Sequence, residues 1–109
     1  MPGDQPEAQE QHIMPEIDRL IHEPARLTIM ANLYVVVSAD MVYLLRQTGL
    51  TWGNLSAQVS RLEQGGYLQV EKGYQGRKPR TLLNLTVQGR AAFRLYRQNM
   101  MEMLDQLSE

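Results

Sequence analysis

Two short helical segments separated by a glycine turn are the feature that most constrains what this chain can fold into. Residues 38–49 are predicted to form the first helix, with Ser38 as its cap and Gly49 at its end. Thr51 is a second capping residue, and the helix after it is predicted to run over 52–64, where two glycines end it. Two helices joined by so short a turn form a helix-turn-helix motif.

The periodicity changes from helix to strand after this motif. Residues 67–71 and 81–85 alternate apolar and polar side chains, the first more regularly than the second, and predict a hairpin of two strands. The segment between them, 73–80, holds two glycines, a proline and three cations and is predicted to be a basic loop. Thr86 caps a final helix predicted over 87–107. This order of elements is that of a winged helix, in which the second helix of the motif enters the major groove of DNA.

The N-terminal third is predicted to contain a tail and two helices. Residues 1–12 are rich in Gln, Glu and Pro and are expected to be flexible. From Ile13 the apolar residues fall at helical spacing and predict a leading helix, and Pro24 opens a second helix that extends to about Val35. The three valines at 35–37 either extend this helix or form a short strand. The second helix is expected to bury Leu27, Met30, Ala31 and Tyr34.

These elements predict a single small domain, mainly α with a small β-hairpin. It is a winged helix-turn-helix with N- and C-terminal helices for dimerisation. The chain divides into a flexible tail at 1–12, a DNA-binding domain with its leading helix at 13–86, and a C-terminal dimerisation helix at 87–109. Its 109 residues leave little room for a second domain, and an oligomer would enlarge so small a core.

Positive charge is concentrated in the middle of the chain. Residues 39–97 carry nine Lys and Arg against three Asp and Glu. Residues 1–38 carry two against six, and residues 98–109 carry none against three. The net charge of -1 therefore conceals a basic centre between acidic ends. Clustered Lys and Arg suit phosphate contacts, so the distribution favours binding to a polyanion, with ordinary fluctuation in a short chain as the alternative.

The composition excludes several classes of function. The absence of cysteine excludes disulfides, thiolate metal sites, iron-sulfur clusters and a cysteine nucleophile. No apolar run approaches the ~20 residues of a membrane span, which predicts a soluble, cytoplasmic protein. His12 and His22 have no recognisable nucleophile or metal-ligand set around them, and no nucleotide-binding loop is present. We expect no enzyme activity, metal or cofactor.

The helix predicted over 52–64 has two distinct faces. At ~100° per residue, Leu55, Val59 and Leu62 form one stripe toward the core, with Trp52 at its edge. Trp52 is predicted to pack there, with a phosphate contact as the alternative. The outer face is small and polar, and Asn and Arg are residue types that pair with adenine and guanine edges, although solvation alone also explains such a face. The predicted recognition residues are Thr51, Asn54, Ala57, Ser60 and Arg61, with Gly53 and Gln64 on the same side.

Three cations within four residues mark the predicted tip of the hairpin. They are Arg77, Lys78 and Arg80, and Pro79 stiffens the segment between them. A stiff loop loses less conformational entropy when it grips phosphates. Arg77 or Lys78 is expected to enter the minor groove, where negative potential is concentrated. A solvated charged hairpin is the alternative.

The last helix is predicted to form a dimer interface. Its apolar residues are spaced 3, 4, 3 and 4, the repeat of a coiled-coil seam, and the helix is long enough at roughly 30 Å to extend beyond so small a domain. The leading helix is expected to share the interface, and a helix packed only on its own domain is the alternative. The predicted interface residues are Ile17, Ile21, Phe93, Tyr96, Met100, Met103 and Leu107, with Leu95 and Leu104 broadening the seam.

Several short motifs appear in order along the chain. They are Gly49-Leu50-Thr51, Gly53-Asn54-Leu55-Ser56, Leu62-Glu63, Gly66-Tyr67, Gly76-Arg77-Lys78-Pro79-Arg80-Thr81, and Leu85-Thr86 with Gly89-Arg90. Over roughly residues 17–97 the sequence resembles a short prokaryotic winged-helix DNA-binding family, similar to transcriptional regulators of the MarR and ArsR kind. The resemblance implies binding to operator DNA as a dimer.

The combined expectation is a homodimeric transcriptional regulator that binds a roughly palindromic DNA operator. Its partners are double-stranded DNA and a second copy of itself, with no membrane partner. A small-molecule effector is left open. The alternative is a winged-helix module that binds another protein without reading DNA, because a fold does not determine a function. The excess of cations in the middle of the chain favours DNA.

Overall fold

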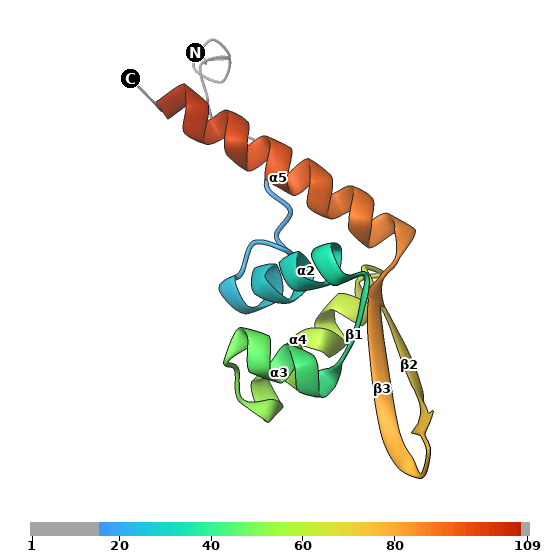
Figure 1. The fold of residues 1–109 in the computed structure, drawn as a ribbon. Helices are drawn as coiled ribbons and strands as arrows, with labels where there is room; N and C mark the ends of the chain where they lie inside the picture. The colour runs from blue at the N-terminus through green and yellow to red at the C-terminus, as the bar shows by residue number, and fades with distance from the viewer. Residues whose placement is uncertain (1–15, 108–109) are drawn as a thin grey trace.

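The computed structural model describes residues 16–107 and contains the elements of a winged helix in the predicted order (Figure 1). The elements are α2 (Pro24–Val36), β1 (Ser38–Asp40), α3 (Met41–Thr48), α4 (Trp52–Gln64), β2 (Leu68–Gln75), β3 (Lys78–Leu85) and α5 (Val87–Leu107). The helices α2, α3 and α4 form the body, the β2–β3 hairpin extends from it as the wing, and α5 passes over α2 and continues beyond the body (Figure 1). The predicted fold class is confirmed. Within residues 16–107, no helix has the length and apolar character needed to cross a membrane.

The sheet has three antiparallel strands in the order β1-β3-β2. Pairing of β2 with β3 runs from Leu68 opposite Leu85 to Gln75 opposite Lys78. The predicted basic loop is therefore wrong over most of its length, because only the two residues between Gln75 and Lys78 form the turn. Gly76, the first of them, has φ 64, the positive value that the first central residue of a type II′ hairpin turn requires. The wing is a regular two-stranded ribbon rather than a loop.

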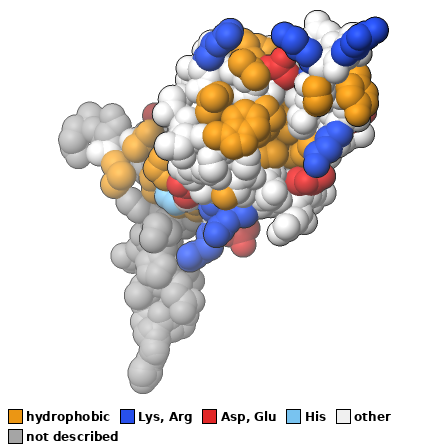
Figure 2. All heavy atoms as spheres, turned by 90° about the horizontal axis from the view of Figure 1, so that it is seen from below, with side chains coloured by type: hydrophobic (Ala, Val, Ile, Leu, Met, Phe, Trp, Pro, Cys, Tyr) orange, Lys and Arg blue, Asp and Glu red, His pale blue; other side chains and the backbone are white. Residues whose placement is uncertain are grey.

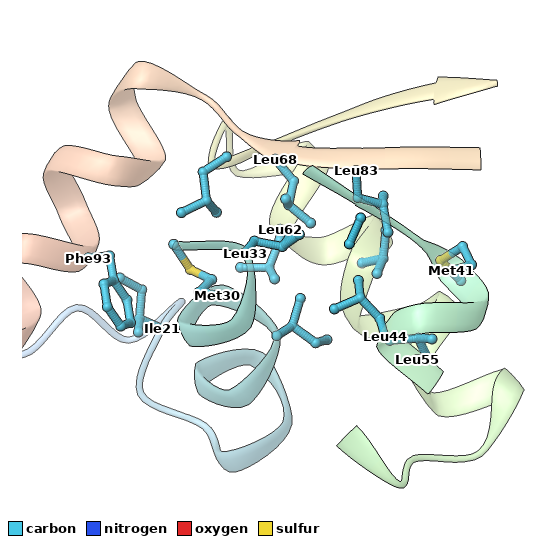
Figure 3. Close-up of a cluster of buried hydrophobic side chains, with 14 of the residues drawn as sticks. Ile21, Met30, Leu33, Met41, Leu44, Leu55, Leu62, Leu68, Leu83 and Phe93 are labelled. Carbon is cyan, nitrogen blue, oxygen red and sulfur yellow. The ribbon is translucent and has the colours of Figure 1, made fainter. Parts of the chain in front are cut away.

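The hydrophobic core lies between α2, α3, α4, the sheet and the first half of α5. Its largest fully buried side chains are Ile21, Ile29, Met30, Leu33, Leu44, Leu55, Leu62 and Leu83. Figure 3 shows Ile21 and Phe93 at the α5 end of this core and Met41 at the opposite end. The core therefore joins α5 and the helix-turn-helix into one packed unit.

The face that α2 buries differs from the predicted one. Its buried residues are Ala25, Ile29, Met30 and Leu33. Of the four predicted residues only Met30 is fully buried, whereas Leu27, Ala31 and Tyr34 are half-buried at the edge of the core. The reason is that α2 contacts α3, α4, α5 and β3. A helix with so many neighbours is apolar over much of its circumference, so spacing alone does not select its most buried face.

The segment after α2 resolves the open question at residues 35–37. The first two valines end α2, and Val37 is its C-terminal cap with φ 74. Ser38 then begins β1, so the prediction that Ser38 caps the next helix is wrong. The cap of α3 is Asp40, whose Oδ1 accepts the backbone N–H of Tyr43 at 2.8 Å.

The predicted leading helix is wrong where the structure describes it. Residues 16–23 form an irregular segment with a turn at its centre. Oδ1 of Asp18 accepts the backbone N–H of Leu20 at 2.9 Å and of Ile21 at 3.3 Å. An aspartate that bonds neighbouring amides in this way competes with helix formation. The predicted tail and the start of this helix, residues 1–15, lie outside the described residues.

Candidate nucleic-acid interface

The two faces of α4 lie as its sequence predicted. Leu55 and Leu62 are fully buried and Val59 is 6 % exposed, so this stripe holds α4 against the core. The residues of the opposite side are all exposed: Gly53, Asn54, Ala57, Ser60, Arg61 and Gln64. Because the buried stripe holds the helix from its inner side, the outer face is free to enter a groove of DNA.

Two of the predicted recognition residues already make hydrogen bonds on this face. Oγ1 of Thr51 accepts the backbone N–H of Asn54 at 3.1 Å and thus caps α4. Nε2 of Gln58 donates to Oδ1 of Asn54 at 3.0 Å. Thr51 therefore acts as the cap that starts the helix, and the amide of Asn54 is oriented by its neighbour one turn later.

Hydrophobic side chains accompany the polar ones on this side of the molecule. Trp52, predicted to pack at the edge of the stripe, is 55 % exposed, so more than half of its side chain faces solvent. Val42 of α3 and Tyr74 of β2 are exposed as well. The view from below, toward the α3–α4 turn and the tip of the wing, shows hydrophobic side chains at the centre with Lys and Arg side chains around them (Figure 2). This surface thus combines apolar side chains with Lys and Arg side chains, and a few Asp and Glu side chains lie among the cations (Figure 2).

The three predicted wing cations occupy different environments. Arg77 lies in the turn and Lys78 begins β3, and both are exposed. Arg80 is half-buried, and its Nε lies 3.7 Å from Oδ2 of Asp40. The same carboxylate caps α3 through its other oxygen. Arg80 thus connects the wing to the start of the helix-turn-helix, whereas the other two cations face solvent.

Two further wing residues were missed by the sequence analysis. Along β2, Leu68 and Val70 face the core, and the period of two places Lys72 and Tyr74 on the same face of the ribbon. Both are exposed, and Tyr74 is 75 % exposed. Arg80, opposite Gly73 in the register, belongs to the other face. Continuing the alternation of β2 past Gly73 would have revealed this pair.

Positive charge dominates the helix-turn-helix and the wing. Residues 41–85 contain six Lys and Arg against two Glu. The exposed cations are Arg46, Arg61, Lys72, Arg77 and Lys78. Around the residues that the structure describes, no group of three His, Asp or Glu side chains is placed to hold a metal ion. The excess of exposed cations makes this surface suited to an anionic polymer.

The predicted dimer seam divides into a buried and an uncovered part. Ile21 is fully buried, and Phe93 and Tyr96 are 9 % and 7 % exposed within a single chain. Their assignment to a dimer interface is corrected, because side chains enclosed by their own core have almost no surface left for a partner. Ile17 is half-buried and packs against the same core.

The uncovered part lies toward the C-terminal end of α5. Met100 is half-buried at the edge of the core, Met103 is half-buried beyond it, and Leu107 is 58 % exposed. Leu104, which is 57 % exposed, lies on the same side of the helix. Leu95 lies nine residues before Leu104, which at ~100° per residue places it on the opposite side. The apolar stripe thus continues past the body of the domain without a covering element among residues 16–107.

A groove of about 710 Å³ separates the irregular segment 16–23 from α5. Its lining includes Asp18, His22, Tyr67, Leu95 and Tyr96. Nδ1 of His22 and the hydroxyl of Tyr96 are 2.8 Å apart, and the hydroxyl of Tyr67 donates to Oδ2 of Asp18. Burial, reinforced by the hydrogen bond and negative charge of Asp18, raises the pKa of Tyr67 to about 12. The groove is thus lined by protonated tyrosine hydroxyls beside a histidine and a carboxylate.

Solved structures share this architecture. The transcriptional regulator homologue protein from Pyrococcus horikoshii OT3 superposes with a TM-score of 0.80 at 27% identity, covering 94% of this chain and 98% of that one. The PcaV transcriptional regulator from Streptomyces coelicolor, in complex with its natural ligand, superposes with a TM-score of 0.69 at 23% identity, and the match covers 84% of this chain and 63% of that one. A MarR-family transcriptional regulator from Silicibacter pomeroyi superposes with a TM-score of 0.63 at 22% identity, and the match covers 81% of this chain and 58% of that one. The last two likenesses show a common fold.

Sequence comparisons agree with the structures. Uncharacterized protein MJ0432 of Methanocaldococcus jannaschii is 30% identical over 78 residues, which are 72% of this chain and 85% of that protein. A family model described as a winged helix DNA-binding domain matches residues 25–104. That match spans α2 through most of α5 and includes the exposed face of α4 and the basic wing. The resemblance found in the motifs is confirmed, and the chain belongs to the winged helix DNA-binding domain family.

Proposed function

We propose that this protein is a transcriptional regulator that binds a roughly palindromic DNA operator as a homodimer. The observation that carries the proposal is the exposed outer face of α4, held by a fully buried stripe and placed beside a basic wing. A recognition helix needs this arrangement, because it must enter the major groove without exposing core residues. The similarity to the Pyrococcus horikoshii regulator homologue over nearly the whole chain supports it.

Base recognition is assigned to the outer face of α4. Arg61 is suited to the O6 and N7 acceptors of guanine, and Asn54 to an adenine or another base with an acceptor edge. Ala57 and Ser60 are small enough to let the helix approach the groove floor closely. Thr51 contributes as the cap that places the first turn of α4.

Backbone contacts are assigned to the wing. Arg77 and Lys78 are exposed near its tip, and Lys72 and Tyr74 extend the core-facing side of the ribbon. Lysine and arginine at such positions neutralise phosphates whatever the base sequence. Arg80 is assigned a structural role instead, because its ion pair with Asp40 holds the wing against the start of α3.

Dimerisation is assigned to the uncovered half of α5, through Met100, Met103, Leu104 and Leu107. The stripe continues the apolar spacing of Phe93 and Tyr96 beyond the core, and a second copy of α5 is the partner that would cover it. Two copies would place two recognition helices on successive half-sites of the operator, as dimeric helix-turn-helix proteins do.

The groove between residues 16–23 and α5 is the candidate site for a small-molecule effector. Its volume of about 710 Å³ lies in the range of ligand pockets, and it combines apolar walls with a few polar groups. Two proteins of the same fold, PcaV and NadR, were solved with bound ligands, which for NadR is 4-hydroxyphenylacetate. Calorimetric titration with that acid as the first probe, compared with the His22→Ala variant, tests the groove.

Selection of bound duplexes from random DNA tests the proposed function. We expect a reproducible motif with two inverted half-sites whose centres are separated by about 10 base pairs or a multiple of it. The matched control is the double variant Asn54→Asp and Arg61→Asp, which reverses the chemistry of the outer face and leaves the buried stripe intact. Enrichment of no motif by the unaltered protein would contradict the proposal and favour a module that binds another protein.

A further inference from the structure

A chain of hydrogen bonds connects α2 to the exposed face of α4. Nη1 of Arg26 donates to Oε1 of Gln58 at 2.7 Å, and Nε2 of Gln58 donates to Oδ1 of Asn54 at 3.0 Å. Arg26 lies on the inner side of α4 and Asn54 on its outer side. We call these three residues the Arg26 relay.

Arg26 is held firmly at the inner end of the relay. Its side chain is only 11% exposed, and its Nε donates to the backbone carbonyl of Leu20 at 2.5 Å. Oε1 of Glu23 lies 3.9 Å from Nη1 and also accepts the backbone N–H of Arg26 at 2.8 Å. The turn around Asp18 in turn holds the backbone of Leu20. These partners fix the position of the guanidinium, because losing a hydrogen bond to a nearly buried charge is costly in free energy.

The relay has only one consistent direction. A guanidinium can donate but never accept, so the amide oxygen of Gln58 must face Arg26 and its NH2 group must face outward. That NH2 group also only donates, so the amide oxygen of Asn54 must face Gln58. The NH2 group of Asn54 is then the part of the amide that is turned away from the relay. An amide alone could adopt either orientation, and the cation removes this freedom.

We propose that Arg26 is a positioning residue for base recognition, which sets the polarity of the Asn54 amide so that Asn54 presents a hydrogen-bond donor to DNA. This inference rests on the proposed function. In the major groove, guanine offers the acceptors N7 and O6 and thymine offers O4, whereas cytosine offers the N4 amino donor. Adenine offers one of each. Asn54 is therefore expected to favour guanine or thymine over cytosine at the position it contacts.

The variant Gln58→Glu tests the polarity directly. A carboxylate at this position still accepts from Arg26, but it has no hydrogen to donate, so Asn54 must turn its NH2 group inward and present its oxygen. The preference at the contacted position is expected to invert toward cytosine or adenine, and the ratio of the Kd values for cytosine and guanine duplexes should change by about tenfold. The contacted position is defined as the one whose preference disappears in Asn54→Ala.

Two further variants separate polarity from charge and from folding. Gln47→Glu adds the same negative charge at an exposed site on α3 outside the relay, so it should weaken binding to all duplexes and leave the ratio unchanged. Arg26→Met keeps an apolar stem and removes the donor, so both amides become free to rotate and the ratio should fall toward one. If Arg26→Met does not fold, Gln58→Glu still decides, because it retains the contact to Arg26.

The possible results separate the Arg26 relay from the proposed DNA-binding function on which it rests. An inverted ratio in Gln58→Glu with an unchanged ratio in Gln47→Glu supports the relay. An unchanged order of the four bases in Gln58→Glu, or an Asn54→Ala variant that alters no position of the motif, would overturn the relay and leave sequence-specific binding in place. Failure of the unaltered protein to select any motif would overturn both.

Discussion

Both α4 and α5 are amphipathic helices, but only α4 completes its packing within one chain. Its stripe residues are at most 6 % exposed. The stripe of α5 is buried at Phe93 and Tyr96 and then emerges, so that Leu104 and Leu107 are 57 % and 58 % exposed. The same spacing of apolar residues therefore has two meanings. In α4 it holds a helix whose other face is free, and in α5 it leaves part of the stripe itself exposed.

The largest expected effect comes from the buried stripe. Leu62→Ala should lower the free energy of unfolding by about 2 to 5 kcal/mol, because it leaves a cavity under α4. Leu107→Ala should change it by less than about 0.5 kcal/mol, because that side chain is exposed in the single chain. Chemical denaturation measures both, at a protein concentration where sedimentation detects only monomers. An equal loss of unfolding free energy in both variants would show that Leu107 contributes to the folding of a single chain as much as Leu62 does.

The next effect separates the two sides of α5. Leu104→Glu places a charge on the uncovered stripe and should convert the dimer to monomers, with affinity for a two-site operator falling by about 10²-fold or more as avidity disappears. Gln98→Glu is the control, since it adds the same charge at an exposed position of α5 on the side away from this stripe and outside the groove. Sedimentation velocity and duplex titration measure the outcome. A Leu104→Glu protein that remains fully dimeric would remove α5 as the interface.

The difference between the helices also explains what the sequence could predict. The bounds and faces of α4 follow from local signals: the Thr51 cap, two terminal glycines and a stripe with one clear period. The strand β1 has only three residues and exists through pairing with β3, more than 40 residues later. The full length of the wing likewise depends on pairing across Gly73 and Pro79, residues that ordinarily interrupt strands. Neither β1 nor the full length of the wing could be predicted from a short stretch of sequence.

Contacts between distant residues account for the remaining errors. The predicted leading helix gives way to a turn in which Asp18 accepts the backbone N–H groups of Leu20 and Ile21 and also the hydroxyl of Tyr67, 49 residues away. The periodicity of α4 was enough to predict which of its residues face outward, but it could not predict their hydrogen-bond partners. The bond from Arg26 to Gln58 crosses 32 residues and two elements. Such a bond depends on how α2 packs against α4, which spacing within each helix does not reveal.

A smaller effect is expected on the free face of α4. Arg61→Ala should weaken binding to the selected operator by about 1 to 3 kcal/mol and relax the choice of one base, because a guanidinium that contacts guanine supplies discrimination rather than general attraction. Binding to a scrambled duplex should change much less. Folding should not change, since Arg61 is exposed opposite the stripe. Equal weakening on both duplexes would assign Arg61 to the phosphate backbone instead.

The smallest effect is expected in the wing. Arg77→Ala and Lys72→Ala should each weaken all duplexes to a similar degree and reduce the slope of log K against log salt by about 0.9 for every phosphate that is no longer neutralised. Glu71→Ala, on the other face of β2, is the control and should leave that slope unchanged or slightly steeper. Titrations at several salt concentrations provide the slopes. Unaltered slopes in both cation variants would separate the wing from DNA binding.

The separation of the two faces of α4 has a consequence for how this protein can diverge. Exposed substitutions away from special features usually alter stability by no more than about 0.5 kcal/mol. Ala57, Ser60 and Arg61 are all exposed opposite the stripe. After a gene duplication, these positions could therefore change freely while Leu55, Val59 and Leu62 keep the helix in place. New specificities would arise in copies that fold as well as their ancestor, whereas a change at Asn54 would also remove the hydrogen bond that Gln58 donates to it.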